Sequence, residues 1–169
     1  IVDMVWEDLT PEKIVTPASV KNSAIVAMAT GCSTNAVVHM LAMARRASIK
    51  LTLDDLDALG RTTPLIANIR PSGKGDYLME DFYYAGGLSA LLEGMRDLLD
   101  LDVPTCTGKT LGENIAGAKI HNADVIHTPD DPMQAEGGLI VVRGNLAPDG
   151  AVIKTTAADP ELLQHAGRA

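Results

Sequence analysis

Hydroxyl and amide side chains precede a long apolar helix that the sequence predicts. In the segment ATGCSTNAVVHMLAMARRA, residues 29–47, Ser33, Thr34 and Asn35 are types that accept hydrogen bonds from the free N–H groups of a first helical turn. The same groups, together with the positive end of the helix dipole, suit a phosphate or carboxylate ligand. Two interpretations therefore stand: ordinary capping, which is the commoner use of such residues, and an anion site.

The histidines and acidic pairs are not grouped along the sequence. His39 follows the apolar face of its helix, where we expect a packed core histidine. Glu80 and Asp81 stand at a predicted helix start, where they complement the dipole, and Asp130 and Asp131 stand beside prolines, where acids are usually solvated. None of the four histidines is spaced as a metal ligand: His39, His121, His127 and His165.

Spacing excludes the two simplest phosphate and metal motifs. A Walker loop needs a glycine five positions before Gly108 of the GKT triplet, and Val103 stands there. The two cysteines, Cys32 and Cys106, lack CxxC or Cys/His spacing, so a disulfide framework or a self-contained zinc site is not expected. Lys74 and Lys109 each follow a glycine and could reach an anion, although surface charge explains them as well.

Composition predicts a globular protein of the reducing cytoplasm. The chain has 169 residues, of which 46% are hydrophobic and 3% aromatic, so its core must be built from aliphatic side chains. A formal charge of −8 argues against nonspecific binding to nucleic acid or to anionic membranes. No apolar run approaches the ~20 residues of a membrane span, and the first residues lack the pattern of a signal peptide.

Capping and turn residues predict the elements that position these side chains. We expect a helix from near Pro17, the helix after Gly31, and a short helix over about 53–59 that ends at Gly60. The run PLIANIRP at 64–71 is typical of a buried strand. Further predictions are two helical pieces within 78–100 broken at Gly86–Gly87, a helix from near Thr110, and a β-hairpin over 139–156 that turns at Pro148, Asp149 and Gly150.

Four segments carry a family resemblance, in the order ATGCSTNAVVHMLAMARRA, IRPSGKGDYLMEDFYYAGGL, TGKTLGENI and GGLIVVRGNLAPDGAVIKTTA. Together they resemble successive signatures of the dehydratases that include dihydroxy-acid, phosphogluconate and sugar-acid (pentonate) dehydratases. The resemblance implies a hydro-lyase that converts a 2,3-dihydroxy acid to a 2-oxo acid with an iron–sulfur cluster, of the 2Fe-2S type, and Mg²⁺. It also implies a homo-oligomer, a dimer or tetramer, that acts on a small hydroxy acid.

The resemblance assigns an α/β fold class and places the chain inside a longer enzyme. Residues 1–128 would form the helix-rich C-terminal part of a large α/β sheet domain, 129–138 a linker, and 139–169 the opening hairpin of an incomplete, β-barrel-like domain. The chain also begins without Met. The cluster cysteines, the Mg²⁺-binding acids and a modified lysine would precede Ile1, and a further glutamate and a serine base would follow Ala169. No catalytic or metal-binding residue is therefore expected within these residues.

Details of the motifs favour the sugar-acid branch, with an arabinonate or xylonate as substrate. MEDFYYAGGL, NLAPDGAVIK and the ending HAGRA resemble that branch more than the branched-chain amino-acid branch. Cys32 departs from the glycine usual in the family, and the SGKGDY loop is longer by two residues. Two alternatives remain: a dihydroxy-acid dehydratase of branched-chain amino-acid synthesis, and a free-standing, non-catalytic binding or assembly module.

The resemblance also bears on the helix N-terminus at Ser33. The dehydration develops negative charge on a carboxylate-bearing substrate, which a helix N-terminus can stabilise. Ser33, Thr34 and Asn35 are therefore the candidate substrate-binding residues of this chain, as ligands of the carboxylate or of a hydroxyl.

Overall fold

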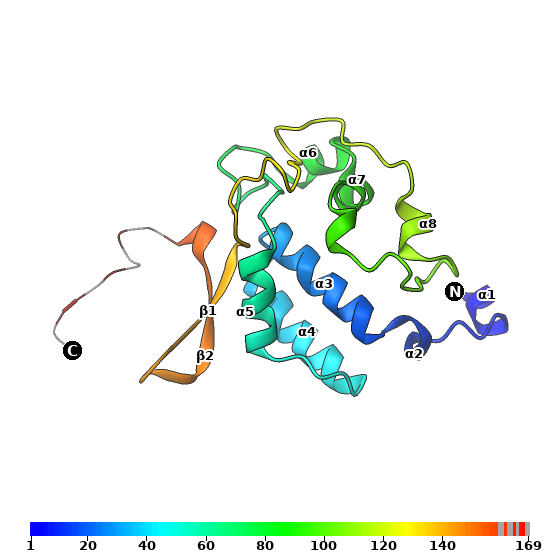
Figure 1. Ribbon diagram of the computed structural model, residues 1–169, viewed down its shortest axis with the longest axis horizontal. Coiled ribbons are helices and arrows are strands. Elements are labelled where there is room, and N and C mark those ends of the chain that lie inside the picture. The colour runs from blue at the N-terminus through cyan, green and yellow to red at the C-terminus, as the bar shows by residue number, and fades with distance from the viewer. Residues whose placement is uncertain (159–160, 162–163, 165, 168–169) are drawn as a thin grey trace.

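The computed structural model describes residues 1–158, 161, 164 and 166–167, and these residues form a helical body followed by a β-hairpin (Figure 1). His165 and parts of the HAGRA ending lie outside the described residues. The helices are α1 (Val2–Trp6), α2 (Pro11–Ile14), α3 (Pro17–Ala29), α4 (Thr34–Arg46), α5 (Leu53–Thr62), α6 (Met79–Tyr84), α7 (Gly87–Gly94) and α8 (Leu111–Ile115), with 3₁₀ turns η1 (Arg96–Leu98) and η2 (Thr155–Ala157). The strands are β1 (Leu139–Gly144) and β2 (Ala147–Lys154), so the predicted helix-rich part and hairpin are confirmed.

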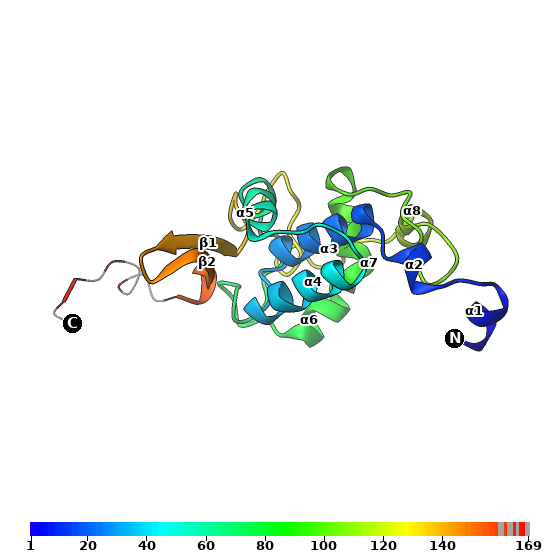
Figure 2. The ribbon, with the colours of Figure 1, turned by 90° about the horizontal axis from the view of Figure 1, so that it is seen from below.

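Helix α3 lies in the middle of the helical body (Figure 2). It begins at Pro17, as the sequence predicts, and the structure adds a capping box between Thr16 and Ser19. One side packs Ile25 and Ala29 against a cluster that includes Phe82 of α6 and Leu91 of α7. The other side packs against α4, α5 and β1 through the buried residues Ala24, Ala27 and Met28. A helix that is apolar on most sides is expected to be surrounded in this way.

The middle of the segment 64–71 is buried, but the prediction of a strand there is wrong. Leu65, Ile66 and Ala67 are fully buried, yet they form only isolated bridges, from Leu65 to Gln134 and from Ala67 to Ile126. The backbone N–H groups of Ile66 and Ala67 instead donate to the carbonyl at the end of α3. A strand needs an extended neighbour, and the segments beside this one are irregular. Periodicity identified the burial but could not reveal the missing partner.

Gly60 does not end α5, which continues to Thr62. The chain approaches so closely here that a Cβ on Gly60 would lie 3.0 Å from the Leu139 carbonyl oxygen. The N–H of Gly137 donates to the Gly60 carbonyl at 2.7 Å. The glycine therefore serves close packing of the hairpin on the helix rather than capping.

Two other predicted boundaries are confirmed. The helix predicted from near Thr110 is α8, and a capping box of Thr110 and Glu113 fixes its start. The region 78–100 divides into α6 and α7 at Gly86, whose φ of 116° is a conformation that favours glycine.

The hairpin is confirmed, but its turn lies at Asn145 and Leu146, because Gly144 pairs with Ala147. Val142 pairs with Ala151, so Arg143 stands opposite the residues 148–150 that the sequence placed in the turn. Pro148 has no N–H for a regular ladder and Gly150 has a φ of 107°, features that suit a bulge within β2. Pro148, Asp149 and Gly150 thus mark a bulge in β2 rather than the loop between the two strands.

The hairpin packs on the helices rather than standing apart. Leu139 is 2% exposed and lies in the cluster with Met28, Val37 and Leu56. The domain boundary placed at 129–138 remains a prediction, although this segment is held by the Gln134 bridge to Leu65. Within the described part of the chain, no helix has the length and apolar character needed to cross a membrane.

Candidate functional site

The N-terminus of α4 presents the three candidate residues on the surface. Ser33 is the N-cap, and its Oγ accepts hydrogen bonds from the Asn35 backbone N–H at 3.2 Å and from Asn35 Nδ2 at 3.1 Å. Thr34 is the first helical residue, and all three side chains are exposed. Ser33 therefore caps the helix, and the Ala36 N–H donates to the Ser33 carbonyl at 2.9 Å. The exposed side chains of Ser33, Thr34 and Asn35 are open to a ligand.

A buried serine fixes the backbone before this helix. Ser72, which is 6% exposed, donates from its Oγ to the Gly31 carbonyl at 2.7 Å. Gly31 has a φ of 55°, and a Cβ there would lie 2.7 Å from Ser72 Oγ and 3.0 Å from Leu65 Cδ1. The SGKGDY loop is thereby attached to the start of α4, and only glycine fits at the junction.

The end of the hairpin reaches the same place. A Cβ on Gly138 would lie 3.0 Å from the Gly31 Cα and 3.4 Å from the Thr156 side chain. Thr155 N–H donates to the Gly138 carbonyl at 3.2 Å, which holds η2 against this junction. Thr156 Oγ1 is buried and has no hydrogen-bond partner within the described residues. Three segments far apart in sequence therefore meet beside Gly31.

Lys154 and Cys32 influence each other at this junction. Burial raises the pKa of the Cys32 thiol, and the charge of Lys154 partly opposes the increase. Burial likewise lowers the pKa of the Lys154 ammonium, with Cys32 opposing the change. The thiol is thus kept protonated at neutral pH, which disfavours a role as a nucleophile or metal ligand. Sequence reasoning missed Lys154, because it lies more than a hundred residues from Ser33 along the chain.

The other candidate residues lie apart from this junction. Lys74 and Lys109 are exposed in their loops, and Asp130 and Asp131 are exposed in a turn closed by a bridge between Thr128 and Asp131. The prediction that His39 lies in the core is wrong, since its side chain is exposed. Helix α4 buries only the narrow stripe of Val37, Met40 and Ala44, and position 39 falls outside it.

The acidic pair at the start of α6 is placed as predicted. Asp81 accepts a hydrogen bond from the Leu78 N–H at 2.7 Å, and both Glu80 and Asp81 lie in the first turn.

The described residues do not fit a metal ion or an iron–sulfur cluster. Among them, no three His, Cys, Asp or Glu side chains come close enough together to hold a metal. Cys106 is exposed, and Cys32 is half-buried beside Lys154. Cluster ligation needs several thiolates around one position. We therefore assign neither group to these residues.

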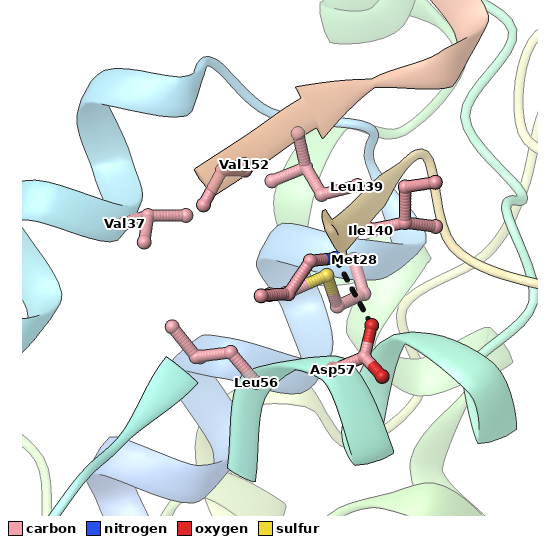
Figure 3. Close-up of a pocket in the computed structure, with 8 residues that line it drawn as sticks. Met28, Val37, Leu56, Asp57, Leu139, Ile140 and Val152 are labelled. Atoms are coloured by element: carbon pink, nitrogen blue, oxygen red, sulfur yellow. Dashed lines mark hydrogen bonds between the residues drawn. The ribbon is translucent and has the colours of Figure 1, made fainter. Parts of the chain in front are cut away.

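A small cavity lies between the hairpin and the helices (Figure 3). Its volume of about 10 Å³ is enough for a water molecule but not for a substrate. Met28, Leu56 and Leu139 line it, and Asp57 stands at its edge, where Oδ1 accepts a hydrogen bond from the Val141 N–H at 3.0 Å. This hydrogen bond lowers the pKa of the Asp57 carboxyl. The contact joins hairpin and helices, so this cavity belongs to the packing of the fold.

Comparison with known proteins identifies the family. The family model described as dihydroxy-acid/6-phosphogluconate dehydratase N-terminal matches residues 1–114, and its C-terminal counterpart matches residues 124–169. The chain therefore belongs to the dihydroxy-acid/6-phosphogluconate dehydratase family, as its motifs indicate. The members of this family are dehydratases, which are hydro-lyases.

Individual relatives are similar over the whole of this chain. An L-arabinonate dehydratase of Rhizobium leguminosarum bv. trifolii is 47% identical over 171 residues, covering 100% of this chain and 29% of the relative. A dihydroxy-acid dehydratase of Caldicellulosiruptor bescii is 43% identical, with 100% of this chain and 31% of the relative covered. A Rhizobium meliloti protein named only as a dehydratase is 49% identical, again with 100% and 29% covered. The chain thus spans less than a third of the length of these relatives.

Proposed function

We propose that this chain is part of a hydro-lyase that dehydrates a sugar acid, an aldonate, to a 2-keto-3-deoxy acid. The observation that carries the proposal is the 47% identity to an L-arabinonate dehydratase along the whole chain. In such a reaction a proton leaves C2 and hydroxide leaves C3, and the resulting enol becomes the 2-oxo acid. The carboxylate next to C2 takes up negative charge as the proton leaves.

The start of α4 is the part of this chain that we assign to the substrate carboxylate or to a hydroxyl next to it. Ser33 and Thr34 offer hydroxyl groups, Asn35 offers an amide, and the first turn of the thirteen-residue helix α4 offers N–H groups and a partial positive charge. Lys154 adds a cation near Cys32, and it forms no ion pair with an acidic side chain among the described residues. The rigid junction at Gly31 supports the proposal, since Ser72 holds the turn that aims the helix.

The iron–sulfur cluster and Mg²⁺ belong to the proposal for the whole enzyme. When bound, they would supply Lewis acidity toward the leaving hydroxyl. Among the described residues no three His, Cys, Asp or Glu side chains come together, and the role that we propose for Ser33, Thr34 and Asn35 is to bind and orient the substrate.

A chimeric enzyme tests the proposed reaction. The 169 residues would replace the matching segment of the R. leguminosarum L-arabinonate dehydratase, of which they cover 29%. We expect the chimera to dehydrate L-arabinonate or another aldonate to a 2-keto-3-deoxy acid, detected as the 2-oxo product. The proposal fails if the chimera folds, contains its metals and turns over no aldonate.

The second candidate, a dihydroxy-acid dehydratase, is favoured by the 43% identity to the C. bescii enzyme. A reciprocal chimera in that enzyme distinguishes the two reactions. Turnover of a branched-chain dihydroxy acid by the second chimera, without turnover of aldonates by the first, would select this candidate.

Ser33→Asp in the active chimera separates substrate binding from capping. Aspartate is as good an N-cap as serine and suits the dipole, so the melting temperature should not fall. Its carboxylate would repel a substrate carboxylate bound at the same helix, and we expect KM to rise about tenfold or more. The matched control is Thr16→Asp, which likewise places an aspartate at a helix N-cap, that of α3. Equal kinetics for both variants would show that Ser33 only caps the helix.

A further inference from the structure

Lys154 differs from the other cations of the chain in its burial. Among the lysines and arginines that the structure describes, it is the only residue that is not exposed. It also forms no ion pair with an acidic side chain of the described residues. A partly buried ammonium without a counter-charge is costly, because the protein replaces only part of its hydration. An anion bound beside Lys154 would offset this cost.

The register of the hairpin turns the Lys154 side chain toward the helices. Lys154 pairs with Leu139, and residues directly opposite in an antiparallel pair have their side chains on the same face. Leu139 is 2% exposed and belongs to the core cluster between the hairpin and the helices. Val152 lies on this face too, because side chains alternate along a strand, and it lines the small cavity with Val37 of α4 (Figure 3). Lys154 therefore lies at the end of the inner face of the hairpin.

This end of the inner face meets the turn that leads into α4. Gly138, which precedes Leu139 on β1, approaches Gly31 so closely that a Cβ on Gly138 would lie 3.0 Å from the Gly31 Cα. Cys32 joins Gly31 to the N-cap of α4. The mutual influence of the Lys154 ammonium and the Cys32 thiol on their pKa values agrees with this proximity. The fold thus places the ammonium beside the first turn of α4.

Positive potential from two sources therefore meets at the start of α4. The helix dipole contributes a partial positive charge there, and Lys154 contributes a full one. Neither residues 29–47 nor residues 150–158 contain an acidic side chain, although the net charge of the chain is −8. We infer that Lys154 binds the substrate, as the cation that pairs with the carboxylate of an aldonate held at the start of α4. The inference rests on the proposed function, and it makes Lys154 a residue that selects acids over neutral sugars.

Lys154→Met in the active chimera removes the charge and keeps an unbranched side chain. We expect KM for the aldonate to rise about tenfold or more, the usual effect of losing a hydrogen bond to a charged group. Lys154→Arg keeps the charge and should recover part of the loss. Lys119→Met is the matched control, since Lys119 is an exposed cation without an ion pair among the described residues. This control should leave KM unchanged.

The charge of the ligand separates substrate binding from a structural role of Lys154. A 3-deoxyaldonate lacks the leaving hydroxyl and cannot react, and its amide also lacks the carboxylate charge, so the two serve as a matched pair of competitive inhibitors. We expect Lys154→Met to weaken inhibition by the acid about tenfold and to leave inhibition by the amide unchanged.

Three outcomes overturn the inference. Equal weakening of both inhibitors would mean that Lys154→Met distorts the site. Unchanged inhibition by the acid, with a lower melting temperature, would mean that Lys154 pairs with an acidic side chain from the rest of the enzyme. In an active chimera these two results overturn this inference alone, whereas a chimera that turns over no aldonate overturns the proposed function and this inference with it.

Discussion

Asp57 connects the hairpin to the helical body through one partly buried hydrogen bond, and its removal should be costly. Its side chain is 18% exposed; Oδ1 accepts from the Val141 N–H at 3.0 Å and Oδ2 from Arg61 Nε at 2.9 Å. A hydrogen bond to a charged group contributes about 1.5–3 kcal/mol, whereas an exposed i,i+4 ion pair contributes about 0.3–0.5 kcal/mol. We therefore expect Asp57→Ala to lower the free energy of unfolding by about 2 kcal/mol.

Urea unfolding followed by circular dichroism gives this free energy, and hydrogen exchange of residues 139–154 shows whether the hairpin loosens first. Asp54 is the matched control on the same helix, since its carboxylate meets Arg143 of β1 at 2.6 Å but is 77% exposed. Asp54→Ala should change the free energy of unfolding by less than about 1 kcal/mol. Similar losses for the two variants would refute the reasoning that the backbone contact of Asp57 holds the hairpin.

Two further predictions concern the same region. Gly31→Ala should lower the free energy of unfolding, measured in urea, by about 3 kcal/mol, because it combines a positive φ with a Cβ 2.7 Å from Ser72 Oγ. Gly108→Ala is the control: its φ is 77° but no atom lies within 4 Å, so the loss should be about 1 kcal/mol. Hydrogen bonds lower the pKa values of Asp55 and Asp57, so the unfolded chain binds more protons in acid. The contribution of these two carboxylates to the free energy of unfolding should therefore be present above about pH 4 and be lost as the pH falls through their folded pKa values. Asp57→Asn should show a smaller loss of stability over this pH range than the unchanged chain.

Local signals predicted the helices well because caps and helical periodicity act within a few residues. The helix starts near Pro17 and Thr110 and the break at Gly86 all lie where the sequence indicated, and capping boxes found in the structure fix the two starts. Each depends on hydrogen bonds or dihedral angles within one turn of the chain. Such features need no knowledge of distant segments.

The errors arose where a distant segment decides what a residue does. Gly60 is a glycine because Leu139 approaches it, and the 64–71 segment is not a strand because its neighbours near Gln134 and Ile126 are irregular. Pro148 and Gly150 form a bulge because the register of β1 places Arg143 opposite them. Single-sequence patterns contain no term for these contacts, which join residues about sixty to eighty positions apart in the first two cases.

The candidate site shows the same division between local and distant effects. Ser33, Thr34 and Asn35 could be singled out because capping and anion binding both use the first turn of a helix. Ser72 and Lys154 could not, since only the fold brings them to the junction beside Gly31 and Cys32.

The residues at the ends of the hairpin contact the turn before α4 at this junction. Gly138 approaches Gly31 so closely that a Cβ on Gly138 would lie 3.0 Å from the Gly31 Cα, and Asp57 and Leu139 anchor the same hairpin to α5. A change that loosens the hairpin should therefore also shift the first turn of α4. In the active chimera, Asp57→Ala should then raise KM for the aldonate while Asp54→Ala does not, although neither residue lies at the start of α4. Equal KM values for the two variants would show that the helix start keeps its position without the hairpin.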